Sequence, residues 1–325
     1  FSVIKYFKTK YKAINIENAT PTTISSSQIN LVKWHRSNQN DSSLRFSALD
    51  QVNRSNVNQL ELAWTYDSED IPNNLGSEDT IQANPIVVNG VIYTPTIGGY
   101  IVAVNAVNGE EIWRYDPPSN KPAQRGLIYF DKKNDNNGKI FFTNGKYLVS
   151  LDSSTGKPSI NFGNEGLVKL SAVSKLTPII YDNQLVVLNF KPSIESFDID
   201  TGQLLWSFAL NQKNKIRNGG KYSIFSGGNP WGGASLDKNR GLLFFSRGNP
   251  RPDWVGVQRM GDNKHSNSVV AFDLKQKKIL WQFQEVRHDI WDLDVSSYPI
   301  LTSIKKGTKK IDVVIAVTKL GNTIV

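Results

Sequence analysis

The chain contains no cysteine and a single methionine, Met260, among its 325 residues. The absence of cysteine excludes disulfide bonds and thiolate metal sites. No run of about eighteen or more apolar residues is present to span a bilayer, so we expect a globular segment. Helical periodicity is not sustained anywhere, which argues against a helical fold.

The composition that remains is rich in aromatic side chains and in positive charge. Hydrophobic residues make up 39% of the chain and include eight Trp and eleven Tyr, which is ample for a sizeable core. The formal charge of +9 raises the question of a nucleic-acid or anionic membrane partner. Lys and Arg are scattered among many Asn, however, without a long basic block or a recognisable nucleic-acid module. This pattern favours a solvated basic surface and no nucleic-acid partner.

The two ends of the sequence indicate a piece of a longer protein. The chain begins with Phe1 rather than Met, and it stops at Val325 within a strand pattern. We therefore expect a mature product or a fragment whose C-terminal part is missing. Residues 1–12 mix basic and aromatic side chains, which fits either a frayed tail or the end of a membrane anchor outside this chain. We expect residues 1–31 to be a tail or linker and residues 32–325 to be the folded part.

A repeat is the main regular feature of the sequence. Each copy has alternating apolar residues, a polar turn of the Asp-x-x-Thr-Gly or Asn-Gly type, and a second apolar strand that ends on a large side chain. This pattern is typical of a β-hairpin. The turn residue and the large side chain eight positions later are Asn105 and Trp113, Asp152 and Ile160, Asp198 and Trp206, and Asp273 and Trp281.

The spacing of the repeat predicts the architecture. The large side chains at positions 64, 113, 160, 206 and 281 are separated by 49, 47, 46 and 75 residues. Such a unit has the length of a four-stranded propeller blade, and the last step includes an insertion of about half a blade. We predict an all-β propeller with five blades, in which residues 312–325 open a sixth. The Trp rings are expected to lock each blade to its neighbour.

An acidic cluster near the end of the chain is the main candidate for chemistry. The sequence His-Asp-Ile-Trp-Asp-Leu-Asp occupies residues 288–294, and Lys319 follows 27 positions after Asp292. Acidic side chains at a strand end together with a downstream cation can abstract a proton and stabilise developing charge. The alternative is that Asp292 caps a turn and Lys319 is a surface lysine.

Several motifs together resemble a known family. They are Trp-His at residues 34–35 with the Ala-Trp of residues 63–64, Gly-Gly-Asn-Pro-Trp-Gly-Gly at residues 227–233, Gly-Asn-Pro at residues 248–250, and the acidic cluster. In this order they are similar to the quinoprotein dehydrogenases, which use pyrroloquinoline quinone (PQQ) on an eight-bladed β-propeller. The motifs at residues 125–129, 162–166 and 318–322 look most like the membrane-bound glucose dehydrogenase branch. The resemblance implies that residues 32–325 form a partial quinoprotein propeller.

The resemblance also implies residue roles. Asp292 would be the general base that takes the substrate hydroxyl proton, and Lys319 would hydrogen-bond the quinone oxygens where charge develops. Trp231 would lie flat under the cofactor ring, while Arg125 and Gln82 would hold its periphery. A divalent cation would be ligated by Asn249, Asp292 and Asp294.

One departure from the family concerns the metal. Relatives carry a metal-binding carboxylate on a longer loop of the fourth blade, whereas Glu195 lies only three residues before Asp198 and is expected on a strand. Asp294 is the residue expected to compensate, as in relatives that accept lanthanides. The cation is expected to be calcium or magnesium, with a lanthanide as the alternative. His288 is expected to orient its loop.

We therefore expect a PQQ-dependent dehydrogenase that oxidises an aldose such as glucose, or an alcohol, by hydride transfer with metal assistance. Its electrons would pass to a membrane quinone such as ubiquinone or to a soluble carrier. The expected location is the periplasm, with attachment to the inner membrane left open. The alternative is a non-catalytic propeller that acts as an assembly scaffold, which would need the repeat but not the acidic cluster.

Overall fold

The computed structural model describes residues 20–21, 34–70, 81–119, 123–132, 138–210, 215–218, 221–224 and 226–325. Within these ranges strands dominate, and the helices are two short 3-10 turns, η3 (Val57–Gln59) and η5 (Gly256–Gln258). None of the described helices is long and apolar enough to cross a membrane. The prediction of an all-β chain is confirmed.

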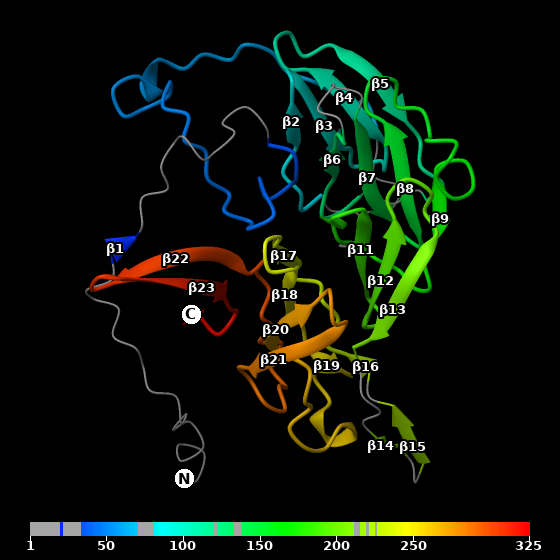
Figure 1. Cartoon of the computed structure of the whole chain (residues 1–325), viewed down its shortest axis with the longest axis vertical. Coiled ribbons are helices and arrows are strands. Elements are labelled where there is room, and N and C mark those ends of the chain that lie inside the picture. The colour runs from blue at the N-terminus through cyan, green and yellow to red at the C-terminus, as the bar shows by residue number, and fades with distance from the viewer. Residues whose placement is uncertain are drawn as a thin grey trace.

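Four antiparallel sheets follow one another along the chain, each built from four strands in sequence order. The first contains β2 (Ile86–Val88), β3 (Val91–Pro95), β4 (Ile101–Asn105) and β5 (Glu111–Tyr115). The second contains β6 (Ile128–Phe130), β7 (Lys139–Asn144), β8 (Tyr147–Asp152) and β9 (Leu167–Lys169). The third contains β10 (Ile179–Tyr181), β11 (Gln184–Asn189), β12 (Ser193–Asp198) and β13 (Leu204–Ala209). The fourth contains β17 (Ala234–Asp237), β18 (Leu242–Arg247), β20 (Ser268–Asp273) and β21 (Lys278–Gln284), and the four sheets are arranged in an arc (Figure 1).

A fifth sheet draws on both ends of the sequence. Strands β22 (Ile300–Lys306), β23 (Lys309–Val317) and β24 (Thr323–Ile324) are joined by β1 (Thr20–Pro21), which pairs antiparallel with β22. Two residues of the predicted tail therefore take part in the sheet. The remainder of residues 1–33 lies outside the described part of the chain, and the division into tail and propeller stays a prediction.

The blades differ in two places from those predicted. The unit that ends at Trp64 forms no sheet of its own in residues 34–70, where only η3 and isolated bridges occur. Residues 312–325, predicted to open a sixth blade, belong to the fifth sheet instead. The periodicity located the turns correctly but could not show which strands share a sheet, because pairing is decided by contacts distant in sequence. The eight-bladed closed ring stays a prediction.

The repeat turns are held by their own acidic side chains. Asp152 Oδ1 accepts hydrogen bonds from the backbone N–H groups of Ser154 and Thr155, at 3.1 and 2.8 Å. Gly156 closes the turn by donating to the Asp152 carbonyl at 2.9 Å, with a φ of +69° that glycine adopts without strain. The carboxylate thus satisfies backbone donors that the hairpin leaves unpaired. Asp198 holds the corresponding turn of the third sheet in the same way.

Two repeat tryptophan rings connect neighbouring sheets as predicted, whereas Trp281 is 44% exposed and packs on Phe244 of its own sheet. The Trp113 ring of β5 lies over the second sheet's turn, where a Cβ added to Gly156 would be 2.5 Å from the ring, and its Nε1 donates to the Ser153 carbonyl at 2.9 Å. Trp206 of β13 stacks on Phe272 of the fourth sheet, with ring centroids 6.2 Å apart. Since the Trp113 and Trp206 rings each belong to one sheet and pack on the next, these contacts fix the order of the blades.

The second sheet departs from this arrangement. Ile160, at the position where the repeat has a large ring, is 80% exposed and is not a packing residue. Phe162 and Val168 approach Gly202 of the third sheet instead. The prediction that Ile160 fills the Trp position is therefore wrong. The chain forms a turn at residues 160–163 rather than continuing as a strand, and this brings Phe162 into the core.

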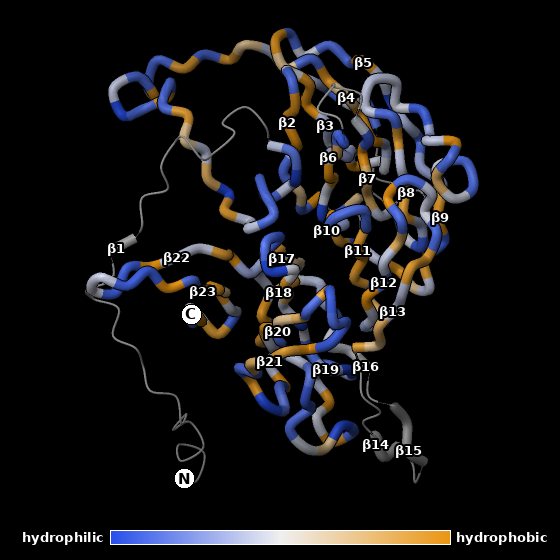
Figure 2. Tube along the Cα trace, in the orientation of Figure 1, coloured by the Kyte–Doolittle hydropathy of each residue, from blue (hydrophilic) through white to orange (hydrophobic). Residues whose placement is uncertain are grey.

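The core consists of apolar layers between consecutive sheets. One layer joins the first and second sheets, another the second and third, and the largest the third and fourth. Apolar residues therefore concentrate on the strands and polar residues on many of the turns, as Figure 2 shows. Because both faces of each inner sheet are covered, no single blade could be stable alone.

The segment of residues 34–43 crosses the inner edges of several sheets. Trp34 exchanges backbone hydrogen bonds with Val87 of β2, and the Asp41 carbonyl accepts one from Leu236 of β17. Arg36 is fully buried, and its Nη2 donates to the Ala234 carbonyl at 2.8 Å. This segment connects the first strands of separate sheets through hydrogen bonds and so stabilises their relative positions.

The insertion predicted before Trp281 is made of two pieces. The first is the hairpin of β14 (Lys215–Asn218) and β15 (Lys221–Ile224). The second is the segment of residues 248–267 between β18 and β20, which contains β19 (Pro250–Arg251) paired with β16 (Ser226–Gly227). The second piece contributes Asn249, Arg251 and Asp253 to the candidate site.

Candidate active site

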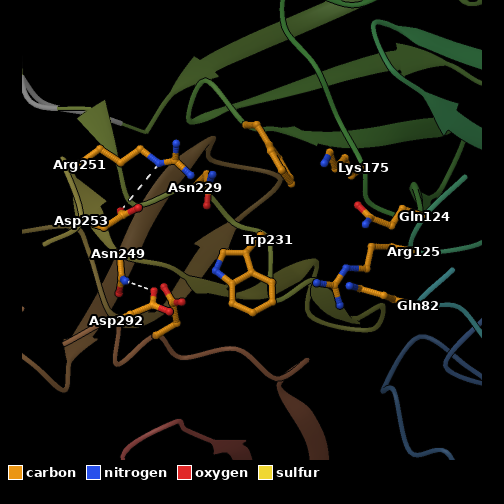
Figure 3. A pocket seen from close by; sticks show the side chains of 12 residues that line it. Gln82, Gln124, Arg125, Lys175, Asn229, Trp231, Asn249, Arg251, Asp253 and Asp292 are labelled. Carbon is orange, nitrogen blue, oxygen red and sulfur yellow. Dashed lines mark hydrogen bonds and ion pairs between the residues drawn. The ribbon is translucent and has the colours of Figure 1, made fainter. Parts of the chain in front are cut away.

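A cavity of about 270 Å³ lies where loops from all five sheets converge. The loops are those that precede the first strand of a sheet and those that join its second and third strands, so all of them lie at the same end of the sheets. Two of the lining side chains are aromatic and ten are polar or charged. The lining residues are Gln82, Gln124, Arg125, Lys175, Phe190, Asn229, Trp231, Asn249, Arg251, Asp253, Asp292 and Asp294 (Figure 3).

The two ends of the cavity differ in charge. Figure 3 shows Arg125 and Lys175, with two glutamines, on one side of Trp231, and Asn249, Asp253 and Asp292, together with Arg251, on the other. The Arg125 guanidinium carbon lies 5.1 Å from the centre of the Trp231 ring. Burial lowers the pKa of Arg125 from its ordinary value, which shows that this cation is partly removed from water. The cavity therefore has a cationic end and an acidic end, with an aromatic ring between them.

A lysine joins the carboxylates of the acidic end. Lys319 Nζ lies 2.9 Å from Asp292 Oδ2 and 2.7 Å from Asp294 Oδ2, and 5.4 Å from the centre of the Trp231 ring. Burial alone would lower the pKa of Lys319, but its hydrogen bonds to the two carboxylates outweigh this effect and raise it. Lys319 is thus an ammonium ion throughout the physiological range.

Asp294 is the more buried of the two carboxyl groups. Its side chain is 5% exposed, against 39% for Asp292. Burial raises the pKa of Asp294, and the Lys319 ammonium opposes this rise. Asp294 Oδ1 accepts no hydrogen bond of good geometry from the described residues, although the neighbouring Trp231 indole N–H helps to lower the pKa of this carboxyl group. A buried carboxylate oxygen without a well-aligned donor is a position where a bound cation would be stabilised.

Glycine brings the backbone close to this group. A Cβ added to Gly248 would lie 2.4 Å from Trp231 Nε1 and 2.7 Å from Asp294 Oδ1. Only a residue without a side chain permits this approach, so Gly248 sets the distance between the loop of residues 248–267, the Trp231 ring and the Asp294 carboxyl group.

The loop that carries Asp292 is held by a second, fully buried acid. Asp289 accepts hydrogen bonds from the backbone N–H groups of Trp291 and Leu293, at 2.9 and 2.8 Å. Asn267 Nδ2 lies 2.8 Å from both Asp289 Oδ2 and Asn249 Oδ1. This contact sets the orientation of the Asn249 amide, whose Nδ2 then donates to Asp292 Oδ1. Asn267 therefore positions two of the predicted site residues.

Arg259 connects the loop of residues 250–263 to the loop of residues 288–294 through hydrogen bonds. It is 1% exposed and donates to the backbone carbonyls of Pro252 and Asp253, at 2.9 and 2.6 Å, and to the carbonyl of Asp289. His288 Nδ1 lies 2.8 Å from the Gly261 carbonyl, in agreement with its expected loop-orienting role. Residues 250–263 and 288–294 consequently form one unit.

The structure brings all the predicted site residues together. Gln82, Arg125, Trp231, Asn249, Asp292 and Asp294 line the cavity, and Lys319 contacts the last two. Their roles remain predictions. Glu195 lies on β12, 5% exposed, and accepts a hydrogen bond from Asn189 Nδ2 at 2.8 Å, so it is not among the lining residues.

Six lining residues were given no role on the basis of sequence: Gln124, Lys175, Phe190, Asn229, Arg251 and Asp253. Four of them had a usable signal, since Gln124 precedes Arg125, Asn229 lies in the motif of residues 227–233, and the Gly-Asn-Pro motif continues into Arg251 and Asp253. Lys175 had none, because it lies in a loop without a motif. Asn267 and Arg259 also went unrecognised, since their importance comes from contacts across the fold.

The side chains near Asp292 offer oxygen ligands to a cation. No cluster of three or more His, Cys, Asp or Glu suited to a metal occurs among the described residues. Asp292 and Asp294 nevertheless present oxygen atoms, which calcium and magnesium prefer, whereas Asn249 turns its Nδ2 to Asp292 and its Oδ1 to Asn267. Calcium takes about six to eight oxygen ligands, so these residues would supply only part of the coordination shell.

Comparison with protein families places this geometry in context. Residues 34–325 match the family model described as PQQ: glucose/ethanol/alcohol dehydrogenase, beta-propeller domain. Among curated relatives, the quinoprotein glucose dehydrogenase of Escherichia coli (strain K12) is 30% identical over 90% of this chain and 42% of its own length. The glycerol dehydrogenase large subunit of Gluconobacter oxydans (strain 621H) is 28% identical over 90% of this chain and 44% of its own length. The chain thus spans less than half the length of these relatives.

Solved structures with the same fold are also found. A europium-containing methanol dehydrogenase has a TM-score of 0.71 at 22% identity, over 88% of this chain and 54% of its own. The quinohemoprotein alcohol dehydrogenase from Comamonas testosteroni has a TM-score of 0.71 at 22% identity, over 90% of this chain and 47% of its own. These similarities establish the propeller fold. The match over residues 34–325 shows that the chain belongs to the β-propeller family of PQQ-dependent glucose, ethanol and alcohol dehydrogenases.

Proposed function

We propose that this chain provides the cofactor site and the proton-accepting group of a PQQ-dependent dehydrogenase that oxidises a hydroxyl group of a sugar or an alcohol. The observation that carries the proposal is the meeting of Trp231, Asp292 and Lys319 at one cavity. The carboxylate can accept a proton, the ammonium ion can stabilise negative charge, and the ring offers a flat face. Trp231 comes from the fourth sheet and Asp292 and Lys319 from loops of the fifth, and together they suit oxidation of a hydroxyl group.

The cavity suits the shape and charge of PQQ, a flat, fused-ring quinone with three carboxylates. Trp231 would lie against its rings, and Arg125 and Lys175 would face its carboxylates, with amide donors from Gln82 and Gln124. When bound, PQQ supplies the two-electron oxidising capacity that no side chain has. The acidic end would be left for the substrate.

Asp292 is proposed as the general base. Its carboxylate borders the cavity and is 39% exposed, so a substrate hydroxyl can reach it. Its Oδ1 receives a hydrogen bond from Asn249 Nδ2 and its Oδ2 faces Lys319 Nζ, which fixes the plane of the carboxylate. When Asp292 accepts the hydroxyl proton, its carboxyl group becomes neutral and Asp294 remains as the charged partner of Lys319. The Lys319 ammonium ion can then stabilise negative charge on an oxygen near Trp231.

A divalent cation is proposed to share the acidic end, ligated by Asp292, Asp294 and Asn249, whose amide would turn its oxygen from Asn267 towards the cation. The buried Asp294 Oδ1 without a well-aligned donor supports this position. The bound cation would supply a Lewis acid that polarises a carbonyl oxygen. Oxygen ligands fit calcium or magnesium, and the extra carboxylate of Asp294 fits a lanthanide.

The remaining expectations are proposals that rest on the family. They are electron transfer to ubiquinone or a soluble carrier, a periplasmic location and attachment to the inner membrane. The scaffold alternative is not favoured, because the matching family is one of dehydrogenases and the cavity gathers the acidic cluster together with a lysine.

The test combines binding and turnover. Purified protein would be mixed with PQQ and calcium, the absorbance of PQQ followed, and reduction of an artificial dye measured with glucose, glycerol and ethanol. We expect a saturable absorbance change and dye reduction with at least one substrate. In the Arg125→Gln variant, PQQ affinity is expected to fall at least about tenfold, since a charge-assisted hydrogen bond is lost.

Arg240→Gln is the matched control. Arg240 is an exposed arginine that pairs with Asp237 and Asp312 away from the cavity, so its loss is expected to leave PQQ affinity unchanged. Absence of PQQ binding with metal supplied would refute the proposal, as would equal losses in the two variants.

A further inference from the structure

Asp253 is a cavity carboxylate that the chemistry above does not use. It lines the acidic end together with Asp292, and its side chain is 29% exposed (Figure 3). Arg251 Nε lies 3.8 Å from Asp253 Oδ1, beyond hydrogen-bond distance, and the Arg251 side chain is 63% exposed. No described residue donates a hydrogen bond to the Asp253 carboxylate, so both oxygens remain available as acceptors.

The backbone of Asp253 is nevertheless held firmly. The buried Arg259 donates to its carbonyl at 2.6 Å and to the carbonyl of Pro252 at 2.9 Å. The same guanidinium donates to the carbonyl of Asp289, in the loop that presents Asp292. One arginine thus fixes Asp253 relative to the proposed base. A loosely solvated carboxylate on a fixed backbone can select a ligand with little loss of conformational entropy.

Charge decides which ligand faces Asp253. A cofactor with three carboxylates is drawn to Arg125 and Lys175 at the opposite end, because the acids Asp253, Asp292 and Asp294 outnumber the cations Arg251 and Lys319 at this end. The partner of Asp253 is therefore a neutral donor in the space next to Asp292. A monohydric alcohol has a single hydroxyl group, which Asp292 engages, whereas a sugar or polyol carries further hydroxyl groups that can donate to a second carboxylate.

We propose that Asp253 accepts a hydrogen bond from a second, non-reacting hydroxyl group of the substrate and so makes the site selective for polyhydroxylated substrates over monohydric alcohols. Since this assignment rests on the proposed function, its test must separate the two. Loss of a hydrogen bond to a charged group is expected to lower kcat/KM for the polyhydroxylated substrate about 10–100-fold.

The experiment removes the Asp253 carboxylate and single hydroxyl groups of the substrate, separately and together, and compares kcat/KM across the combinations. The PQQ- and calcium-loaded protein and its Asp253→Ala variant would be assayed with glucose, with deoxy sugars that each lack one hydroxyl group, and with ethanol. We expect wild type to lose about 10–100-fold in kcat/KM with one particular deoxy sugar, and the variant to be insensitive to that same deletion. Most of the loss should appear in KM, and kcat/KM for ethanol should change by less than about twofold, because the contact is remote from the reacting carbon.

Controls separate a substrate contact from a structural effect. Asp262→Ala removes a half-exposed acid of the same loop that pairs only at 3.9 Å with Arg287 and is not a lining residue, so it should alter no substrate preference. Asp253→Asn keeps the size of the side chain and should retain part of the preference. Equal losses with every substrate, or a variant that still discriminates among the deoxy sugars, would overturn the assignment. If the proposed function itself were wrong, wild type would bind no PQQ and oxidise none of the substrates.

Discussion

The repeat turns and the cavity loops both hold carboxylates, but their hydrogen-bond donors lie at very different distances along the chain. Asp152 and Asp198 bind donors two and three residues further on. Asp289 also has local donors in Trp291 and Leu293, but it binds Asn267, 22 residues away, as well, and Asp292 binds Lys319, 27 residues away. A turn acid is therefore a local device that stabilises one hairpin, whereas a cavity acid takes its geometry from several sheets. Substitutions in the two regions should separate stability from chemistry.

The largest expected effect of a substitution is a loss of kcat at the cavity residue Asp292. Asp292→Asn keeps the size of the side chain but removes its basicity, so kcat for dye reduction should fall about 10²–10⁴-fold. PQQ binding and the unfolding temperature should change little, because the residue is partly exposed. The paired control, Asp152→Asn in a repeat turn, should keep wild-type kcat. An Asp292→Asn protein with unchanged kcat would exclude Asp292 as the base.

The next largest effect concerns Asn267, which positions site residues and does not line the cavity itself. Asn267→Ala removes the shared donor of Asn249 and Asp289, so kcat should fall about 10–100-fold, as for other groups that orient ligands or catalytic side chains. Asn267→Asp should be as impaired, because a carboxylate cannot donate. PQQ affinity, measured by absorbance titration, should change less than kcat does. Asn53→Ala, in an exposed loop, is the control, and a loss of affinity that matched the loss of kcat would indicate general disruption of the site.

The same division between local and distant contacts explains what the sequence could predict. The turn of Asp198 was predictable because it depends on neighbours within one repeat, and the ring of Trp113 because its position recurs from one repeat to the next. The grouping of Asp292 with Lys319 followed from a motif. Lys175 and Asn267 were not predictable, because their loops carry no pattern and their place depends on how separate sheets pack.

The fold shows the same limit. Periodicity identified an all-β chain, yet it could not predict that Thr20–Pro21 pairs with β22, because that contact joins residues nearly 300 positions apart. It also misassigned Ile160, since a turn replaced the strand that the repeat required.

In the repeat region, the expected effect is on stability alone. Gly156→Ala places a Cβ 2.5 Å from the Trp113 ring at a φ of +69°, which should lower the free energy of unfolding by about 1–3 kcal/mol. Gly307→Ala is the matched control: its φ is +61° with no atom within 4 Å, so it reports the backbone cost without the clash. Both should keep wild-type kcat in the folded protein. Equal destabilisation by the two would show that Trp113 does not lock the sheets.

The smallest expected effect is a pH dependence at a turn. The backbone N–H of Thr201 holds the pKa of Asp198 below its ordinary value of 3.8, helped by the Thr201 hydroxyl and the N–H of Asp200. The folded carboxyl group thus binds its proton more weakly than the unfolded one, so its stabilising contribution is present above pH 3.8 and is lost as pH falls through the lower folded pKa. Asp198→Asn should cost about 1 kcal/mol at neutral pH. In denaturant unfolding curves the gap between variant and wild type should narrow below about pH 3.8; a gap that stayed constant into acid would mean that the ionised carboxylate does not stabilise the turn.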